Sequence, residues 1–447
     1  MPSPARKLAF DALKDIDRGG YADVVLHRLL HQRSLSHLDR QFATELVYGI
    51  VRRQRTLDAL IDQLGTKKAQ QQPLDLRIVL HLGLYQLRYL DQVPESAAVN
   101  TSVDLAKAIG KTKLAGVVNG ILRQYIRLRQ AQPDPLKLPG DRTAALAIQH
   151  SYPTWIVELW QDQLSGHDLE ALCDWFNRPP TIDLRINLLK KSRPELVEAF
   201  AEAGIQTEHL PGLPQLLRLS QHVGSIRQLP GYHEGWWTVQ DASAQLVSHL
   251  INPQPGDTVI DACAAPGGKA THLAELMGDQ GTIWACDRTT SRLNKVKQNL
   301  KRLELSSIKP FTGDSTTITR FTEQGDRVLV DAPCSGLGTL HRHADARWRQ
   351  TPETVADLTT LQAKLLAQAA TWVKPNGILV YATCTLHPAE NEAQIQQFLA
   401  THSHWSVRSP EPDDIAANYA TPEGWIKVWP HLHDMDGFFM VKLQRQE

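Results

Sequence analysis

The 447-residue sequence has few cysteines and no long apolar run. Its five cysteines are too few for the disulfide framework of a small secreted protein, and none lies in a C-x-x-C or Cys/His zinc pattern. No apolar stretch approaches the roughly 18 residues of a membrane-spanning helix, so we expect no membrane segment. The opening residues MPSPARKLAF contain no apolar core of signal-peptide length, which indicates a cytoplasmic protein.

The chain also lacks a net charge, because 48 Lys and Arg residues are matched by 48 Asp and Glu residues. Taken alone, this balance argues against a polyanionic partner. The charge is unevenly distributed, however: residues 1–150 have 22 basic and 14 acidic side chains, a net of +8, whereas residues 151–235 and 236–447 have a net of −4 each. An excess of this kind indicates either a nucleic-acid partner or a solvated helical face, and both interpretations remain open.

The length suggests about three domains, and the first of them is predicted to be helical. Apolar residues recur with a 3.6-residue period between residues 5 and 130, and no strand-like alternation interrupts them. Residues 39–64 predict one amphipathic helix, broken at most once, with Asp39 as its N-cap and Gly65 just past its end. The Pro-rich segment AQPDPLKLPGD predicts a linker. We therefore expect an all-α domain over residues 1–145.

The rest of the chain predicts two domains that contain strands. Residues 146–235 read as a small α+β domain, helical to residue 177, with strands TIDLRIN and IQTEHL on either side of a helix that begins at Pro194. From residue 236 to 447, strands and helices alternate, which predicts a doubly wound, Rossmann-like α/β domain with a parallel sheet. The run GFFMVKL near the end predicts an added edge strand.

One loop of the last domain has the features of a nucleoside site. DACAAPGGKAT follows a predicted strand, where ligands bind in open α/β sheets, and Gly267 and Gly268 let the backbone approach a ligand closely. The loop matches neither the Walker A pattern nor G-x-G-x-x-G. Asp287 ends the next strand, nineteen positions after Gly268, where a carboxylate can accept both hydroxyls of a ribose. These features favour S-adenosylmethionine as cofactor; a tight turn beside a surface Asp is the alternative.

Two further loops place a thiol at the end of a predicted strand. They are DAPCSGLGTL, which contains Cys334, and YATCTLHPAENE, which contains Cys384. A disulfide is not expected in a reducing compartment, so the pair indicates chemistry. A thiolate that adds to carbon 6 of a pyrimidine makes carbon 5 able to attack a methyl sulfonium. Asp331 is placed to hydrogen-bond N3 and the amine of a cytosine that is single-stranded or flipped out. We assign Cys173 and Cys286 to packing.

The three motifs DACAAPGGKAT, DAPCSG and YATCT resemble the cofactor loop, the Pro-Cys loop and the nucleophile loop of the RNA (cytosine-5) methyltransferases. This resemblance implies that Cys384 is the nucleophile, that Cys334 assists product release, and that Asp331 belongs to the catalytic group. It also implies that a larger set of residues binds the cofactor: Cys263, Ala264, Ala265, Pro266, Gly267, Gly268, Lys269, Asp287, Asp314 and Asp331. For Lys269, contact with the cofactor carboxylate, contact with the substrate and the capping of a turn all remain open.

The helical N-terminal part, including VVNGILR, is similar to the RNA-binding fold of the antitermination factor NusB. The three domains together resemble those of the bacterial enzymes that methylate carbon 5 of cytosine 967 in 16S ribosomal RNA. The resemblance implies 16S rRNA as partner, no metal, no membrane, and a monomer. Methylation of tRNA or another rRNA, and a non-catalytic RNA-binding or antitermination factor, are the alternatives. After the Pro-Cys loop, four basic residues either attract RNA phosphate or form a solvated face: His341, Arg342, His343 and Arg347.

Overall fold

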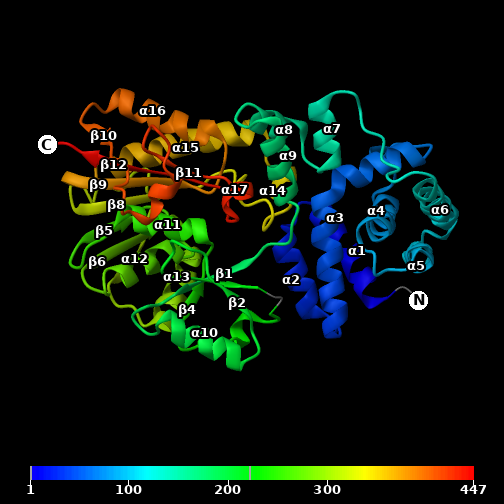
Figure 1. The fold of residues 1–447 in the computed structure, drawn as a ribbon, viewed down its shortest axis with the longest axis horizontal. Coiled ribbons are helices and arrows are strands. Elements are labelled where there is room, and N and C mark those ends of the chain that lie inside the picture. The colour runs from blue at the N-terminus through cyan, green and yellow to red at the C-terminus, as the bar shows by residue number, and fades with distance from the viewer. Residues whose placement is uncertain (1–2, 221–222) are drawn as a thin grey trace. The chain divides into compact units, whose positions relative to one another are not determined.

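The computed structural model describes residues 3–220 and 223–447 (Figure 1). The chain forms two compact units. The N-terminal unit comprises the chain up to Arg178 together with Leu340–Arg349, and the C-terminal unit comprises Pro179–Thr339 and Gln350–Glu447. No helix within the described ranges is long and apolar enough to cross a membrane. The three-domain division with boundaries after residues 145 and 235 stays a prediction.

The N-terminal unit is helical, as its periodicity predicts. The long helix α3 runs unbroken from His37 to Leu64, and Gly65 is its C-cap. Its N-cap is Ser36, whose hydroxyl accepts a hydrogen bond from the Asp39 backbone, so the prediction that Asp39 is the cap was wrong. The other helices of this unit are α1 (Pro4–Asp17), α2 (Ala22–Gln32), α4 (Leu74–Tyr89), α5 (Glu95–Ala108), α6 (Ala115–Ala131), α7 (Arg142–Gln149), α8 (Thr154–Gln161), α9 (Gly166–Trp175) and α14 (Ala346–Arg349).

Arg347 of α14 is fully buried inside the N-terminal unit. Its guanidinium donates hydrogen bonds to the backbone carbonyls of Arg52 and Ser151, each at 3.2 Å, and to the Asn177 side chain at 2.9 Å. It also lies 4.3 Å from the centre of the Tyr152 ring. Burial lowers the pKa of Arg347 to about 10. Both interpretations of this residue, a contact to RNA phosphate and a solvated face, were therefore wrong, because the side chain is fully buried and its two Nη groups donate to partners inside this unit.

The C-terminal unit begins with a small antiparallel sheet in the order β2-β3-β1-β4. The predicted strands correspond to β1 (Ile182–Ile186) and the very short β2 (Thr207–Glu208), and the predicted helix to α10 (Arg193–Glu202). The sequence analysis missed β3 (Leu216–Leu219) and β4 (Trp237–Val239). Both pair with β1, so the two predicted strands are not neighbours.

The larger sheet has the order β10-β12-β9-β8-β5-β6-β7, with β11 paired to β12. The five strands from β9 to β7 are parallel, as predicted, and β12 is antiparallel to β9. The strands are β5 (Thr258–Asp261), β6 (Thr282–Asp287), β7 (Ile308–Thr312), β8 (Gly325–Asp331), β9 (Val373–Thr383), β10 (Trp405–Val407), β11 (Ile426–Val428) and β12 (Phe438–Arg445).

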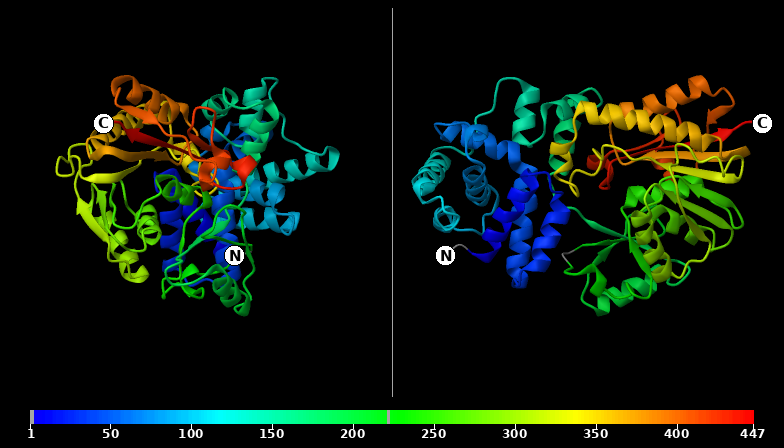
Figure 2. Two further views of the ribbon diagram at one scale, coloured as in Figure 1. Left: turned by 60° about the vertical axis from the view of Figure 1, so that its left-hand side comes forward. Right: turned by 180° about the vertical axis from the view of Figure 1, so that it is seen from behind.

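Helices cover both faces of this sheet (Figures 1 and 2). One apolar cluster joins the strands to α11, α12 and α13, and a second joins them to α15 and α16. The prediction that GFFMVKL forms an edge strand was wrong, because β12 lies between β9 and β10 and is buried on both faces. The helices of this unit that follow β4 are α11 (Ala242–Ile251), α12 (Gly268–Leu276), α13 (Thr290–Leu303), α15 (Pro352–Ala370), α16 (Glu392–Thr401) and α17 (Pro430–His433).

Candidate active site

The glycine loop connects the end of β5 to the start of α12. Gly267 has φ of +105°, and a Cβ there would lie 3.3 Å from the Val296 side chain, so this turn requires glycine. The Ala264 backbone donates a hydrogen bond to the carbonyl of Cys286 on β6, at 2.8 Å. The loop is therefore held against the next parallel strand, whose last residue is Asp287.

The Asp287 carboxylate is 3% exposed and already oriented. Its Oδ1 accepts hydrogen bonds from the backbone and hydroxyl of Thr289, at 3.0 and 3.1 Å, and its Oδ2 lies 3.4 Å from the Arg292 guanidinium. Asp314, which follows β7, is exposed, and hydrogen bonds from Thr316 lower its pKa. The adjacent Ser315 hydroxyl donates to the Ala262 carbonyl at 2.6 Å, which connects this segment to the glycine loop.

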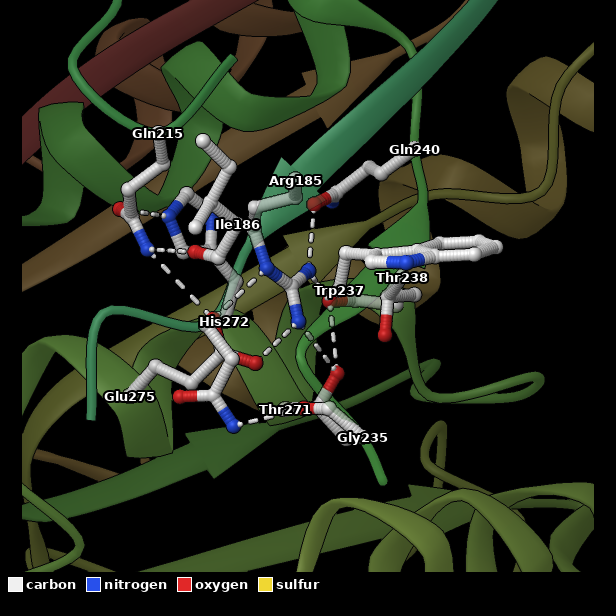
Figure 3. A network of polar contacts seen from close by, with 12 residues as sticks. Arg185, Ile186, Gln215, Gly235, Trp237, Thr238, Gln240, Thr271, His272 and Glu275 are labelled. Atoms are coloured by element: carbon white, nitrogen blue, oxygen red, sulfur yellow. Dashed lines mark hydrogen bonds and ion pairs between the residues drawn. The ribbon is translucent and has the colours of Figure 1, made fainter. Parts of the chain in front are cut away.

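A buried arginine is hydrogen-bonded to the glycine loop and to α12, and Figure 3 shows it among Gln240, Thr271 and Glu275. Arg185, on β1, is fully buried and donates to the Gly268 carbonyl at 2.6 Å and to both carboxylate oxygens of Glu275 on α12, at 2.7 and 2.9 Å. Burial raises the pKa of Glu275, while the Arg185 charge opposes that rise. The sequence analysis missed this residue; the signal was Asp183 and Arg185 on one face of a strand whose other face is apolar.

Two thiols meet where β8 and β9 end. Strand register pairs Asp331 with Ala382, and the sulfur atoms of Cys334 and Cys384 lie 3.3 Å apart. The hydrogen bond from the Cys334 thiol lowers the pKa of Cys384 against the opposing effects of burial and the Asp331 charge, and the Lys269 charge acts in the same direction as the hydrogen bond. The same hydrogen bond, together with burial, raises the pKa of Cys334 well above its ordinary value. These opposite pKa shifts favour a thiolate at Cys384 and a protonated thiol at Cys334.

Lys269 and Asp331 form an ion pair beside these thiols. The Lys269 ammonium lies 2.7 Å from Asp331 Oδ2 and 5.1 Å from the centre of the Phe438 ring. Burial opposes the ammonium charge, but Asp331 outweighs it and the pKa of Lys269 is raised. The glycine loop and the Pro-Cys loop are thus connected by the ion pair between Lys269 and Asp331.

Asp261, the last residue of β5, is a second site residue that the sequence analysis did not single out. It is 1% exposed; its Oδ1 accepts a hydrogen bond from the Cys263 backbone at 3.3 Å, and its Oδ2 has no partner among the described residues. Burial first, and then the Asp331 charge, raise its pKa to about 7. In the described part of the chain, Asp261 Oδ2 is thus a buried polar atom left unsatisfied beside the glycine loop.

The structure brings the predicted residues into two adjoining groups. The glycine loop, Asp287 and Asp314 lie at the ends of β5, β6 and β7, and the thiols with Asp331 lie at the ends of β8 and β9. Cys173, in the N-terminal unit, and Cys286, which directly precedes Asp287 on β6, are both fully buried. Within the described parts of the chain, no group of three or more His, Cys, Asp and Glu side chains is arranged to hold a metal ion.

Comparison with known families defines the class. Three family models match successive parts of the chain: the NusB family at residues 3–127, a ferredoxin-like domain of RsmF/B-like methyltransferases at 152–225, and the 16S rRNA methyltransferase RsmB/F at 248–444. These matches define a methyltransferase with an N-terminal NusB-like domain, and they confirm the predicted fold of each part.

The relatives then specify the family. The probable ribosomal RNA small subunit methyltransferase B of Synechocystis sp. is 52% identical over 99% of both chains, and that of Bacillus subtilis is 33% identical over 99% of this chain and 98% of its own. The chain belongs to the RsmB/F family of rRNA methyltransferases.

Solved structures agree with this assignment. The crystal structure of PH0851 superposes with a TM-score of 0.81 at 25% identity over the whole of both chains. A methyltransferase homolog from Pyrococcus horikoshii gives 0.60 at 28% identity, covering 69% of this chain and 100% of its own. NSun6 from Pyrococcus horikoshii with SFG also gives 0.60, at 20% identity over 67% of this chain and 99% of its own, and shows the fold alone.

The Arg185–Glu275 pair predicts strong energetic coupling. Arg185→Met leaves the Glu275 carboxylate buried without its cation, so we expect it to destabilise the C-terminal unit by about 3–5 kcal/mol. Adding Glu275→Leu removes the unpaired charge and should recover at least about 1 kcal/mol. Denaturant unfolding of the single and double variants measures both values.

The control is Lys374→Met, which removes a half-exposed ammonium 2.6 Å from Asp326 and should change stability by less than about 1 kcal/mol. Additive effects of Arg185→Met and Glu275→Leu would contradict the coupling.

Proposed function

We propose that this enzyme methylates carbon 5 of a cytosine in 16S rRNA, of the cytosine 967 type, through a covalent adduct between Cys384 and carbon 6 of the base. The observation that carries the proposal is the thiol pair: two sulfur atoms 3.3 Å apart with opposite pKa shifts, at neighbouring strand ends. A methyltransferase that acted on oxygen or on an exocyclic amine would need no nucleophilic thiol.

The glycine loop and its neighbours fit S-adenosyl-L-methionine, which supplies an electrophilic methyl group when bound. A Cβ at Gly267 would fill part of the turn, and the buried oxygen Asp261 Oδ2 is unpartnered. Asp287 would accept the ribose hydroxyls, and residues 263–269 with Asp314 would surround the rest of the cofactor. NSun6, which has the same fold, was solved with SFG, an analogue of S-adenosylmethionine.

The thiols divide the reaction into two parts. The Cys384 thiolate bonds to carbon 6 of cytosine, which moves the electron pair of the ring double bond to carbon 5 and lets that carbon take the methyl group. A base then removes the carbon 5 proton, the double bond re-forms, and the Cys384–carbon 6 bond breaks to return the thiolate. Cys334, a protonated thiol in contact with Cys384, is positioned to assist that last step.

Asp331 and Lys269 are positioned to hold the cytosine. We propose that Asp331 accepts a hydrogen bond from the exocyclic amine, which uracil lacks. The ammonium of Lys269 is hydrogen-bonded to Asp331 Oδ2, and its charge stabilises the Cys384 thiolate. Both contacts favour a role for Lys269 at the substrate rather than as a turn cap. The target base must be single-stranded or flipped out to reach this site.

The NusB-like domain supports RNA as the partner. Its excess of basic residues includes Arg123 and Arg127, which are exposed and one turn apart on α6. Such residues attract phosphate without reading sequence, so they strengthen binding while the catalytic site selects the base.

Substitution of each cysteine in turn separates the roles of the two thiols. We expect Cys384→Ala to abolish both methylation and the covalent RNA adduct, because the nucleophile is gone. Cys334→Ala should also lose turnover but should accumulate the adduct, because release is blocked. Denaturing gel electrophoresis with a labelled 16S rRNA fragment measures the adduct, and Cys173→Ala, at a buried thiol of the N-terminal unit, is the control that should keep turnover. The reverse pattern for Cys334 and Cys384 would refute the assignment.

Asp287 is predicted to bind the cofactor and not the RNA. Asp287→Ala should weaken S-adenosylmethionine binding by about tenfold or more, corresponding to roughly 1.4 kcal/mol for the lost ribose contacts. RNA affinity should stay within about twofold. Calorimetry with the cofactor and filter binding with RNA give the two values, and an unchanged cofactor affinity would remove Asp287 from the site.

Arg123 and Arg127 are predicted to contact phosphate. Arg123→Glu/Arg127→Glu in the full chain should weaken RNA binding and reduce the slope of log affinity against log salt by about 0.7 per lost contact. The control is Arg28→Glu/Arg33→Glu, which makes the same charge change at residues already paired with Asp15 and Asp11. Equal effects of the two double variants would show that only total charge matters.

A further inference from the structure

The segment that follows the nucleophile loop contains two adjacent buried polar residues that the proposed chemistry does not use. Glu390 ends the short helix η4 (Pro388–Glu390), and Asn391 precedes α16. Both side chains are completely buried. Burial of a carboxylate and an amide is costly unless each is fully hydrogen-bonded, so their partners indicate what they stabilise.

The partners of Glu390 lie on both sides of Cys334. Its Oε1 accepts hydrogen bonds from the Ser335 backbone and from the Gln362 amide, each at 2.9 Å, and its Oε2 accepts from the Ser335 hydroxyl. The same Gln362 amide donates to the Pro333 carbonyl at 2.9 Å. The residues before and after Cys334 are thus held by one carboxylate and one bridging amide.

The partners of Asn391 lie on both sides of Cys384. Its Oδ1 accepts a hydrogen bond from the Thr383 hydroxyl at 2.6 Å, and its Nδ2 donates to the Thr385 carbonyl at 2.9 Å. The hydroxyls of Thr385 and Ser335 are 2.8 Å apart, which connects the two loops directly. Each of the two adjacent residues therefore fixes the backbone around one thiol.

We propose that Glu390 and Asn391 are positioning residues that set the distance between the thiols, with Glu390 holding the Cys334 loop and Asn391 holding the Cys384 loop. This inference rests on the proposed function and deepens it, because it assigns the two half-reactions to separate supports. Loss of the Glu390 support acts on adduct release, and loss of the Asn391 support acts on adduct formation.

The attachment of the Glu390–Asn391 segment to β9 supports this assignment of one support to each thiol loop. The Tyr381 hydroxyl donates to the Glu390 backbone carbonyl at 2.7 Å, so the segment is fixed to the strand that leads to Cys384. The Glu390 charge also contributes to the raised pKa of Cys334, after the hydrogen bond with Cys384 and burial. The same charge also opposes the lowering of the pKa of Cys384, so the Glu390 charge acts on both thiols, whereas its hydrogen bonds hold the Cys334 loop alone.

The test compares Glu390→Gln with Asn391→Ala in the full-length enzyme, using a 16S rRNA fragment and S-adenosylmethionine. In Glu390→Gln, the new NH2 group meets a hydrogen-bond donor of Ser335 or Gln362 where an oxygen accepted before, so the Cys334 loop shifts. We expect kcat to fall by about tenfold or more while the covalent adduct accumulates. In Asn391→Ala the Cys384 loop is released, and both kcat and adduct formation should fall by about tenfold or more.

One kinetic constant and two further variants separate a positioning role from a general loss of structure. The KM for S-adenosylmethionine should stay within about threefold in both variants, because the cofactor loop belongs to β5 and β6. Glu392→Gln is the matched control: this residue of the same segment pairs with Lys427 at 2.6 Å, and the variant should behave as wild type. Ser335→Ala removes the hydroxyl that donates to Glu390 and contacts Thr385, but keeps the Ser335 backbone hydrogen bond to Glu390. It should reproduce the adduct accumulation in milder form, which keeps the test decisive if Glu390→Gln does not fold.

The outcomes are distinct. Accumulation of adduct in Glu390→Gln and Ser335→Ala, with its loss in Asn391→Ala, supports the inference. Wild-type turnover in Glu390→Gln and Asn391→Ala, or identical loss of turnover and adduct in both at unchanged cofactor KM, would overturn it. If the wild-type enzyme formed neither a covalent adduct nor methylated cytosine, the proposed function itself would be refuted.

Discussion

The parallel register of β8 and β9 is the constraint on which the rest of the site depends. It pairs Asp331 with Ala382, so the loops that leave these strands begin side by side and bring Cys334 and Cys384 to 3.3 Å. A slip of one residue would turn the side chains of one strand to the opposite face and separate the thiols. The strands are buried on both faces by helices, and β12 continues the sheet beyond β9, so the register is determined by packing on every side.

Buried polar side chains hold the loops whose backbone is not paired in the sheet. The glycine loop and the thiol loops are short irregular segments, whose backbone groups no strand can satisfy. Arg185 holds the first through the Gly268 carbonyl, and Glu390 with Asn391 holds the other two. Each of these side chains is completely buried and bonded, which makes it expensive to displace. The loops that would meet the substrates are thereby hydrogen-bonded to buried side chains of neighbouring segments.

The sequence predicted the parts of this arrangement that are local. The 3.6-residue period predicted the helices of the N-terminal unit, and alternating strands and helices predicted the parallel sheet and the loops at its carboxyl edge. It could not place GFFMVKL inside the sheet, because strand order depends on pairing between distant segments. Arg185 and Glu390 were missed for the same reason, since their partners Glu275 and Ser335 lie 90 and 55 positions away in the chain. Asp261 was missed because its burial and the nearby charge of Asp331 depend on the folded sheet. Arg347 was read as a surface residue because nothing in the sequence shows that carbonyl oxygens surround it.

The charges of the site follow from its burial. After burial, the charges of Asp331 and Asp287 raise the pKa of Asp261, and the charge of Lys269, which is paired with Asp331, opposes that rise. Burial and the Asp331 charge leave Asp261 with a pKa of about 7 and an unpartnered oxygen, so its negative charge is only partly compensated. A positively charged ligand at the ends of β5 and β6 would relieve this repulsion, whereas a phosphate would increase it. The equal totals of basic and acidic residues therefore have a physical meaning: a helical part with a net charge of +8 can attract a polyanion, while the carboxylates at the ends of β5, β6 and β8 favour a cation.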